Sequence, residues 1–284
     1  MVVADARAQL AGRVAVVTGA GSGLGAAMAR SFAEAGMAVA VLDIDEANAG
    51  KVAASLAEEF DVPTTSRRVD VGDSASVADA ARHVRSALGG CHILCANVGV
   101  QQFGAVDKLT EQDWEWLLNV NVKGTVRTVR EFLPLLRAAD GFRRIVFTAS
   151  SSVLAPGVRL AAYQTTKFAV TGFAETVRAE LADEGIGVTI LFPGGMMTRH
   201  LESSALARPT DLGPSETSPG DVEAMLAYQP MGEGDVVDAE HAVRNLVADL
   251  LGDEPYSLTH GSYREQYNQR RDALERAFDR MEAS

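Results

Sequence analysis

Arg13-Val-Ala-Val-Val-Thr-Gly-Ala-Gly-Ser-Gly-Leu-Gly25 places an apolar strand directly before a cluster of glycines and the start of a helix. The glycines permit a tight turn and let a pyrophosphate approach the helix N-terminus, where unpaired N–H groups favour anions. A glycine cluster alone is a weak indicator, but its position between strand and helix favours dinucleotide binding. The residues expected at this site are Gly19, Ser22, Gly23, Leu24 and Gly25.

Apolar runs of strand length alternate with longer amphipathic segments from residue 13 to about residue 193, which is typical of a parallel sheet covered by helices on both faces. We therefore expect an α/β fold with a Rossmann-like, doubly wound parallel sheet in three α/β/α layers, forming a single domain over residues 1–284. The expected strands are Arg13–Thr18, Met37–Asp43, Thr64–Val69, Cys91–Asn97, Arg143–Ser150, Gly187–Phe192 and Tyr256–Thr259. The expected helices are Gly23–Ala35, Glu46–Phe60, Ser74–Leu88, Thr110–Arg137 and Ala162–Glu184, with a capping box at Thr110 and Asp113.

The pattern changes after Thr198. Residues 198–234 contain four prolines with several Gly and Ser, which predicts a mobile substrate loop rather than a helix. A linker between two domains is the alternative, but about 50 residues follow it, too few for an independent core. These residues predict a helix at Val236–Leu251 and a charged helix at Ser262–Met281. We treat 252–284 as a C-terminal extension.

The bulk properties exclude several partners. The net charge is −12 and the 26 basic residues are scattered, so nucleic-acid binding is not expected. No leader segment and no run of about 18 apolar residues is present, which predicts a cytoplasmic protein with no membrane contact. Cys91 and Cys95 would lie about 13 Å apart on one strand, too far for a disulfide. His92 points to the opposite face, so no metal site is expected.

Asp43 indicates the choice of cofactor. It ends the second strand about 20 residues after the glycines, where a carboxylate can bind both adenosine ribose hydroxyls and repel a 2′-phosphate. No basic residue stands near Ser22 or Ile44. NAD(H) is therefore favoured over NADP(H). The alternative is that Asp43 caps the helix that begins near Glu46, and the two roles can coexist.

Three residues predict proton transfer. Tyr163 and Lys167 stand at i and i+4, on one face of a helix. A tyrosine with an ordinary pKa near 10 is a poor base, so a nearby ammonium and an oxidised nicotinamide would be needed to favour the phenolate. By itself the pair also fits a structural surface contact. Ser150, at the C-terminal end of a strand where ligands collect, favours the catalytic interpretation because its hydroxyl can bind a substrate oxygen.

From Gly12 to about Thr198 the chain resembles the short-chain dehydrogenase/reductase family, and the ordered set of motifs makes this resemblance specific. The matching pieces, in order, are Thr18–Gly25, Asp43, Asp70-Val71, Asn97-Val-Gly99, Asn119-Val-Asn121-Val-Lys-Gly124, Ser150, Tyr163, Lys167 and Pro193-Gly-Gly-Met-Met-Thr198.

The resemblance implies a role for each matched residue. Tyr163 would exchange a proton with the substrate oxygen, Ser150 would orient that oxygen, and Lys167 would hold the nicotinamide ribose and lower the pKa of Tyr163. Asn121 would help to hold a water that links the lysine to solvent. The resemblance assigns the remaining cofactor contacts to Ile44, Asp70, Val71, Asn97, Gly99, Pro193, Gly194, Met196 and Thr198.

Two departures from the family pattern stand out. The family carries Asn-Asn-Ala-Gly after the fourth strand, whereas this chain has Ala96-Asn97-Val98-Gly99. Because the first Asn commonly ties neighbouring strands together, its loss puts local rigidity in doubt. The second departure is the charged C-terminus beyond Gly252, which is longer than usual and resembles tails that pack near the substrate cleft or the subunit interface.

The predicted function is the NAD(H)-dependent interconversion of a secondary alcohol and a ketone. An NADPH-linked carbonyl reductase and a non-catalytic cofactor-bound scaffold are the alternatives. The loop after Thr198 could form an apolar lid over a hydrophobic or aromatic substrate, or simply pack down; its candidate residues are Met225, Leu226, Tyr228 and Met231. Arg199 and His200 could touch a polar substrate group, although such loop residues are more often solvated. The resemblance also implies a homodimer or homotetramer.

Overall fold

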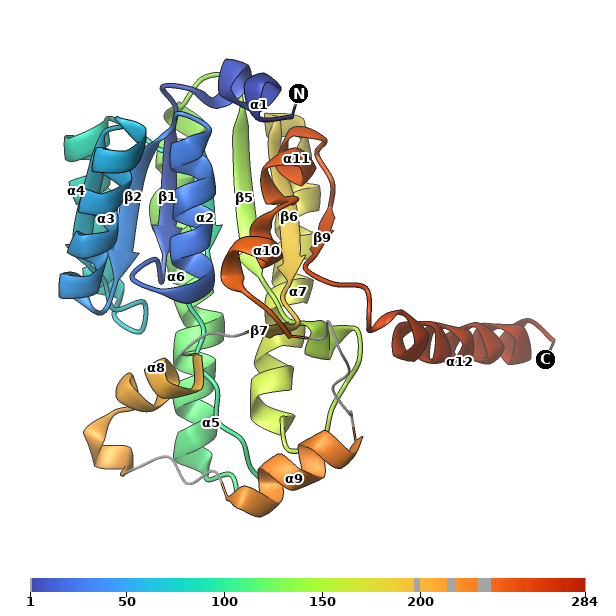
Figure 1. The fold of residues 1–284 in the computed structure, drawn as a ribbon. Helices are drawn as coiled ribbons and strands as arrows, with labels where there is room; N and C mark the ends of the chain where they lie inside the picture. Colours follow the sequence, from blue (N-terminus) through green and yellow to red (C-terminus); the bar gives the residue numbers. More distant parts are fainter. Residues whose placement is uncertain (1, 197–199, 214–217, 229–235, 284) are drawn as a thin grey trace.

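The computed structural model describes residues 2–196, 200–213, 218–228 and 236–283. Within these ranges, a seven-stranded parallel sheet with the order β3-β2-β1-β4-β5-β6-β9 lies between two layers of helices (Figure 1). The expected doubly wound α/β fold is therefore confirmed. The strands are β1 Val14–Thr18, β2 Ala38–Asp43, β3 Thr64–Arg68, β4 Ile93–Ala96, β5 Arg143–Thr148, β6 Ile186–Phe192 and β9 Tyr256–Leu258.

The strands β1, β2, β4 and β6 are mostly apolar and buried because both faces of the sheet are covered, whereas the edge strand β3 is polar and partly exposed. Val14 and Val16 of β1 pack into one buried cluster, whereas Ala15 and Val17 point into the other. The first cluster is closed by α4 (Ser74–Leu88), α6 (Gly124–Ala138) and α7 (Ala161–Leu181). The second is closed by α1 (Val2–Leu10), α2 (Gly23–Glu34), α3 (Glu46–Phe60), α10 (Ala239–Val243) and α11 (Leu246–Leu251).

The helix predicted over Thr110–Arg137 is not uniform. It consists of α5 (Glu111–Leu117), a π-helical stretch over Leu118–Lys123, and α6. Gly124 N–H reaches back five residues to the Asn119 carbonyl, which marks the wider turn. The predicted capping box is confirmed: the Thr110 hydroxyl accepts from the Asp113 N–H, and the Asp113 carboxylate accepts from the Thr110 N–H.

The single helix predicted over Val236–Leu251 is wrong. Val236–Val237 forms the short strand β8, which pairs in parallel with β7 (Gly195–Met196), and the helical part is divided into α10 and α11. The Asp238 carboxylate accepts from the His241 N–H at 2.6 Å, so it caps α10 and starts a new element there. A periodicity that fits one helix thus conceals a strand, a cap and two helices.

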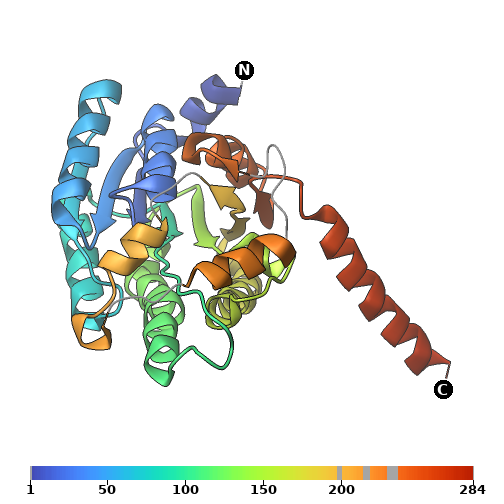
Figure 2. The same ribbon diagram turned by 60° about the horizontal axis from the view of Figure 1, so that its bottom comes forward.

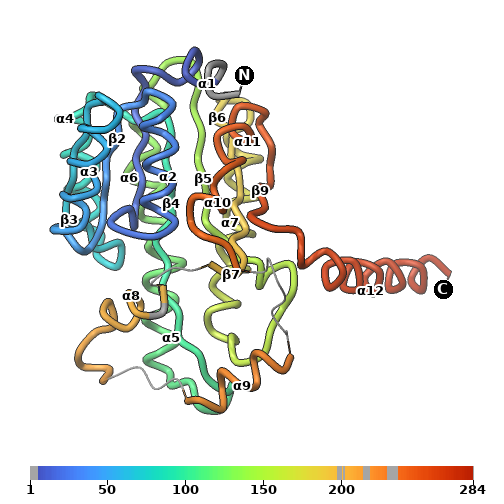
Figure 3. The backbone as a smooth tube through the Cα atoms, viewed as in Figure 1, coloured from blue at the N-terminus to red at the C-terminus, as the bar shows by residue number. Residues whose placement is uncertain are grey.

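Residues 198–234 also contain more regular structure than their prolines predicted. The described parts form α8 (His200–Leu206), a 3₁₀ turn at Thr210–Leu212 and α9 (Pro219–Tyr228). Proline is tolerated in the first helical turn, and Pro219 occupies this position in α9. Pro214 and Pro230 lie outside the described residues. Figures 1 and 3 show α8, α9 and α5 gathered beyond the end of the sheet to which β6 points.

The C-terminal extension ends in the 19-residue helix α12 (Arg264–Glu282), which projects away from the sheet in both views (Figures 1 and 2). Large apolar side chains on it are exposed, among them Leu274 and Phe278. Cys91 and Cys95 are buried and free, as predicted. None of the helices in the described ranges is both long enough and apolar enough to cross a membrane.

Candidate active site

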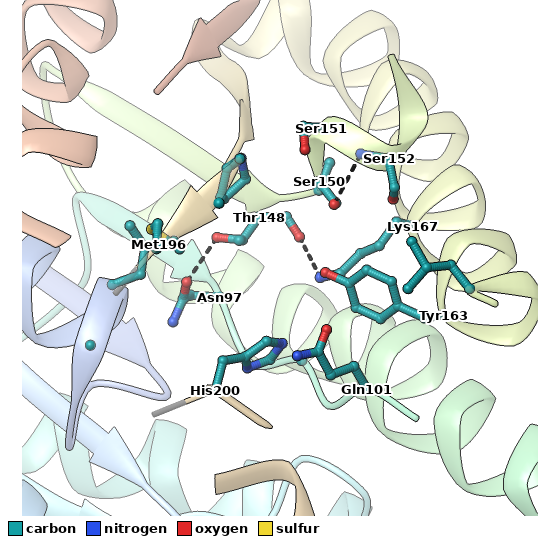
Figure 4. Close-up of a pocket in the computed structure, with 18 of the residues that line it drawn as sticks. Asn97, Gln101, Thr148, Ser150, Ser151, Ser152, Tyr163, Lys167, Met196 and His200 are labelled. Carbon is teal, nitrogen blue, oxygen red and sulfur yellow. Dashed lines mark hydrogen bonds between the residues drawn. The ribbon is translucent and has the colours of Figure 1, made fainter. Parts of the chain in front are cut away.

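A cavity of about 370 Å³ lies at the carboxyl ends of the central strands, where ligands of open α/β sheets bind (Figure 4). It brings together predicted residues from five separate segments of the chain: Ser22, Gly23, Leu24, Asn97, Gly99, Ser150, Tyr163, Lys167, Pro193, Gly194 and Met196. Other predicted residues do not line it: Gly19, Gly25, Asp43, Ile44, Asp70, Val71 and Asn121. Thr198 lies outside the described residues.

The glycine turn has the geometry of an anion cradle. Gly19 and Gly23 have positive φ angles of 67° and 53°, which glycine adopts without strain. A Cβ on Gly25 would lie 2.0 Å from the Gly19 carbonyl oxygen and 2.8 Å from Asn97 Nδ2, so only glycine fits there. Ser22, the N-cap of α2, makes no side-chain cap, and the first N–H groups of the helix are available to a phosphate.

Asp43 lies beside this turn at the end of β2. Its carboxylate accepts from the Gly21 N–H at 2.8 Å and from the Asp45 N–H at 2.9 Å. The alternative role for Asp43 as the cap of α3 is wrong, because Asp45 is the N-cap and accepts from the Asn48 N–H. The half-exposed carboxylate of Asp43 therefore supports the turn, and each of its oxygens keeps a lone pair for a further donor.

Asp70 and Val71 follow β3 as predicted, but outside the cavity. Asp70 Oδ1 accepts from the Gly72 N–H at 2.8 Å, which holds the turn after the strand. Val71 is buried against Gly124, where an added Cβ would come within 2.7 Å of Val71 Cγ2. Because β3 pairs with β2, these two residues follow the strand next to the one that ends in Asp43.

The hydrogen bonds between strand ends that the alanine at position 96 put in doubt are made by the next residue, Asn97. Asn97 donates from Nδ2 to the Thr18 carbonyl at 3.0 Å, and its Oδ1 accepts from the Thr148 hydroxyl at 2.9 Å. The Asn97 N–H also donates to the Thr18 hydroxyl at 3.1 Å. A single asparagine thus links the ends of β1, β4 and β5, although position 96 holds alanine.

Tyr163, Ser150 and Lys167 converge on one buried wall of the cavity (Figure 4). Burial raises the pKa of Tyr163 to about 12, and a hydrogen bond with Ser150 opposes this shift. Burial lowers the pKa of Lys167 to about 8. The Lys167 Nζ lies 5.7 Å from the centre of the Tyr163 ring. In this structure burial is therefore the largest influence on the pKa of Tyr163. The net shift of this pKa is upward, whereas the family resemblance implied a downward shift.

Asn121 lies in the π-helical stretch and is buried beside this wall. Its side chain accepts from the Val100 N–H at 2.8 Å and donates to the Val100 carbonyl at 2.8 Å and to the Thr166 hydroxyl at 2.9 Å. These bonds join the loop after β4 to α7. The observed contacts make Asn121 a positioning residue, and its predicted part in holding a water stays a prediction.

Two residues around the cavity were not among the predicted catalytic and cofactor-binding residues. The imidazole of His200, for which solvation was the default expectation, lies in the cavity with its ring centre 6.5 Å from that of Tyr163. Tyr263 of the C-terminal extension also lines it, and its hydroxyl accepts from the Gly195 N–H at 3.3 Å. Neither residue belongs to a local motif, because tertiary contacts alone bring them to the site.

The residues predicted to form an apolar lid differ in whether they line the cavity. Met225 lines the cavity, whereas Leu226 and Tyr228 are exposed, so α9 presents one side chain to the site. Met231 and Arg199 lie outside the described residues. Of the lid candidates within the described residues, Met225 is the one that lines the cavity.

The chain is similar to known proteins in both sequence and structure. The sequence profile described as short chain dehydrogenase matches residues 13–208. The short chain dehydrogenase pigC of Monascus ruber is 34% identical over 198 residues, covering 68% of this chain and 65% of the relative. The D-beta-hydroxybutyrate dehydrogenase of Cupriavidus necator is 28% identical over 225 residues, covering 79% of this chain and 86% of the relative.

A solved structure extends the likeness to nearly the whole chain. It is a short chain dehydrogenase/reductase from Burkholderia phymatum in complex with NAD, with a TM-score of 0.84 and 27% sequence identity. The match covers 94% of this chain and 95% of the other.

Proposed function

Because the chain belongs to the short-chain dehydrogenase family, an oxidoreductase family, we propose that it interconverts a secondary alcohol and a ketone with NAD(H). The observation that carries this proposal is the shared wall of Tyr163, Ser150 and Lys167, which faces the same cavity as the glycine turn. A protein that only bound a dinucleotide would need the turn but not this wall. The arrangement therefore favours turnover over a scaffold role.

The side chains divide the work of proton transfer. In the oxidation direction, the Tyr163 oxygen accepts the proton of the substrate hydroxyl. The Ser150 hydroxyl donates a hydrogen bond to the substrate oxygen and orients it. The ammonium of Lys167, together with a bound oxidised nicotinamide, would have to offset the burial that raises the pKa of Tyr163 before the phenolate can form. Bound NAD would supply the hydride acceptor. In the reduction direction Tyr163 returns the proton to the carbonyl oxygen.

The residues around the turn fit NAD. A Cβ at Gly25 would fill the cradle, and the N-terminus of α2 is free to bind a phosphate. The carboxylate of Asp43 would bind ribose hydroxyls and repel a 2′-phosphate, which favours NAD over NADP. The Burkholderia phymatum relative, whose structure contains NAD, supports the same choice.

The lining of the cavity supports a substrate with a hydrophobic or aromatic body. Phe103, Leu160, Met196 and Met225 contribute apolar surface around the catalytic wall. These side chains would exclude water from the reacting carbon once a substrate is bound. We therefore expect secondary alcohols with an aromatic or cyclic group to be better substrates than short aliphatic ones.

The test is NADH formation with a panel of aliphatic, aromatic and steroid secondary alcohols, with NAD and NADP in parallel. Tyr163→Phe should lose at least about 10³-fold in kcat, while its NAD affinity, measured by calorimetry, stays within about threefold. Tyr267→Phe, which removes a hydroxyl from the exposed Tyr267 of α12, is the matched control. Tight NAD binding without turnover of any alcohol or ketone would contradict the proposal and favour a scaffold.

We also propose a homodimer or homotetramer formed through the outer faces of α5, α6 and α7, and a cytoplasmic location. Phe168 and Phe173 on α7 are only partly buried, and a Cβ built on Gly172 would meet no described atom within 4 Å apart from its chain neighbours and the backbone of its own helix, which would permit close approach of another subunit. Light scattering coupled to gel filtration gives the number of subunits, and cell fractionation gives the location. A monomer at micromolar concentration would contradict the first proposal.

A further inference from the structure

One side of the cavity carries polar side chains that the proposed chemistry does not use. Figure 4 shows the Gln101 amide and the His200 imidazole pointing toward one another, away from the Ser150 hydroxyl. Gln101 follows β4, whereas His200 begins α8, about 100 residues later in the chain. The two groups therefore meet only through the fold.

The backbone holds this pair in place. The Gln101 N–H donates to the hydroxyl of Ser204, a buried residue one turn after His200 on α8. The preceding residue, Val100, is clamped at both its N–H and its carbonyl by the Asn121 amide. The backbone at Gln101 is thus bonded to α8, which carries His200, and the preceding residue is bonded to Asn121 beside Tyr163 and Lys167.

Their polar atoms are unused within the part of the chain that the structure describes. No hydrogen bond there involves the side-chain amide of Gln101 or either ring nitrogen of His200. Each group offers a donor and an acceptor. Partly buried polar groups without partners cost free energy, which a ligand with a matching group would recover.

The charge around the pair defines the group that it can bind. Among the described residues that line the cavity, Lys167 is the one with a formal charge at neutral pH, and it donates to the Thr148 carbonyl. Burial and the nearby charge of Lys167 lower the pKa of His200 to about 4, so its imidazole is neutral. The cation among these residues, Lys167, is already bonded to the Thr148 carbonyl, and the neutral pair offers a carboxylate no charge of its own, whereas a hydroxyl or carbonyl finds both a donor and an acceptor at the pair.

We propose that Gln101 and His200 bind a second, uncharged polar group of the substrate, a hydroxyl or a carbonyl, at the end remote from the reacting carbon. This inference rests on the proposed function and narrows it. The preferred substrates are bifunctional: one oxygen meets Tyr163 and Ser150, and another meets the Gln101 and His200 pair. The pair acts as a specificity determinant and takes no part in proton transfer.

The test uses pairs of ketones that differ by one hydroxyl, with NADH as reductant. The probes are acetophenone against 3′- and 4′-hydroxyacetophenone, cyclohexanone against 4-hydroxycyclohexanone, and 4-acetylbenzoate as the charged comparison. We expect kcat/KM to rise roughly tenfold with the hydroxyl in at least one pair, mainly through KM, and to fall with the carboxylate. Calorimetry on the NADH-bound protein should show the same order of affinities.

Variants of Gln101 and His200 test whether these two residues cause the preference for hydroxylated ketones. In Gln101→Leu and His200→Phe the hydroxyl preference should fall to about threefold or less, whereas His200→Gln should retain most of it. His241→Phe, at an exposed histidine on α10, and Gln269→Leu, on α12, are the matched controls. The inference is overturned if the wild type shows a ratio near one between kcat/KM for the hydroxylated ketone and that for the unsubstituted ketone. It is also overturned if both variants keep this ratio, or if the carboxylate is preferred, even when acetophenone is reduced through Tyr163. If no ketone is reduced at all, the proposed function has failed and the inference fails with it.

Discussion

Lys167 donates a hydrogen bond from Nζ to the main-chain carbonyl of Thr148 at 2.9 Å. The hydroxyl of the same threonine donates to Asn97 Oδ1. Thr148, at the end of β5, therefore connects Lys167 to Asn97, the residue that links β1, β4 and β5. The ammonium is thereby held in a buried position with one fixed partner. A buried lysine of this kind couples the stability of the fold to pH.

The stability of the wild type relative to Lys167→Met should depend on pH. The pKa of Lys167 is about 8 in the folded protein and near 10.5 in the unfolded chain, so between these values the unfolded state binds the extra proton. The contribution of Lys167 to the free energy of unfolding is therefore greatest above pH 10.5, where the lysine is neutral in both states. This contribution falls as pH is lowered from 10.5 and is lost as pH falls through 8. Compared with the variant, the wild type should gain roughly 3 kcal/mol from pH 7 to 10.5 in urea unfolding. Lys51→Met, at an exposed lysine on α3, should show no such trend.

Gly25→Ala should abolish dinucleotide binding. The new methyl group would lie 2.0 Å from the Gly19 carbonyl oxygen, which forces α2 away from the turn and removes the anion cradle. Gly50→Ala on α3 is the matched control, because its nearest neighbour is 3.9 Å away. We expect Gly50→Ala to raise stability by about 0.5–1 kcal/mol and to leave NAD affinity unchanged. Calorimetric titration with NAD measures both variants, and normal affinity in Gly25→Ala would contradict the assignment of the cradle.

The fold and the catalytic wall could be predicted from the sequence because local signals encode them. Strands buried on both faces read as apolar runs, and the glycine turn and the Tyr163–Lys167 pair have fixed spacings. The π-helical stretch at 118–123 could not be predicted, since one wider turn hardly changes the amphipathic pattern. His200 and Tyr263 could not be placed either, because tertiary contacts alone bring them to the cavity.

The departure at Ala96 shows a further limit of motif reading. The resemblance assigned the strand tie to a position that holds alanine here, yet Asn97 makes the tie through Thr18 and Thr148. A missing residue in a motif therefore did not mean a missing interaction. The geometry of the neighbouring residue decided the outcome, and the sequence pattern does not contain that information.

Asp43→Asn should reduce the preference for NAD over NADP. The amide oxygen keeps the hydrogen bond from the Gly21 N–H, so the turn is preserved while the negative charge is removed. The ratio of kcat/KM for NAD to that for NADP should fall by roughly tenfold, since one charge–phosphate repulsion is lost. Asp45→Asn removes the same charge two residues away and still caps α3, because asparagine is an equally good N-cap. An unchanged ratio in Asp43→Asn, or an equal change in both variants, would argue against the role of Asp43.

Arg208→Met should loosen the segment that carries His200. Arg208 pairs with Asp113 at 2.7 Å, with both side chains buried, and its guanidinium lies 5.4 Å from the centre of the Trp116 ring. Removing one partner leaves a buried charge uncompensated, which costs about 3 kcal/mol when the surroundings cannot relax. Arg137→Met, which breaks the exposed pair with Glu184, should cost far less stability because solvent screens both charges. Because Ser204 on the same segment holds Gln101, KM should rise more than kcat falls in Arg208→Met. Equal urea midpoints and equal KM values in the two variants would show that the buried pair does not fix this side of the cavity.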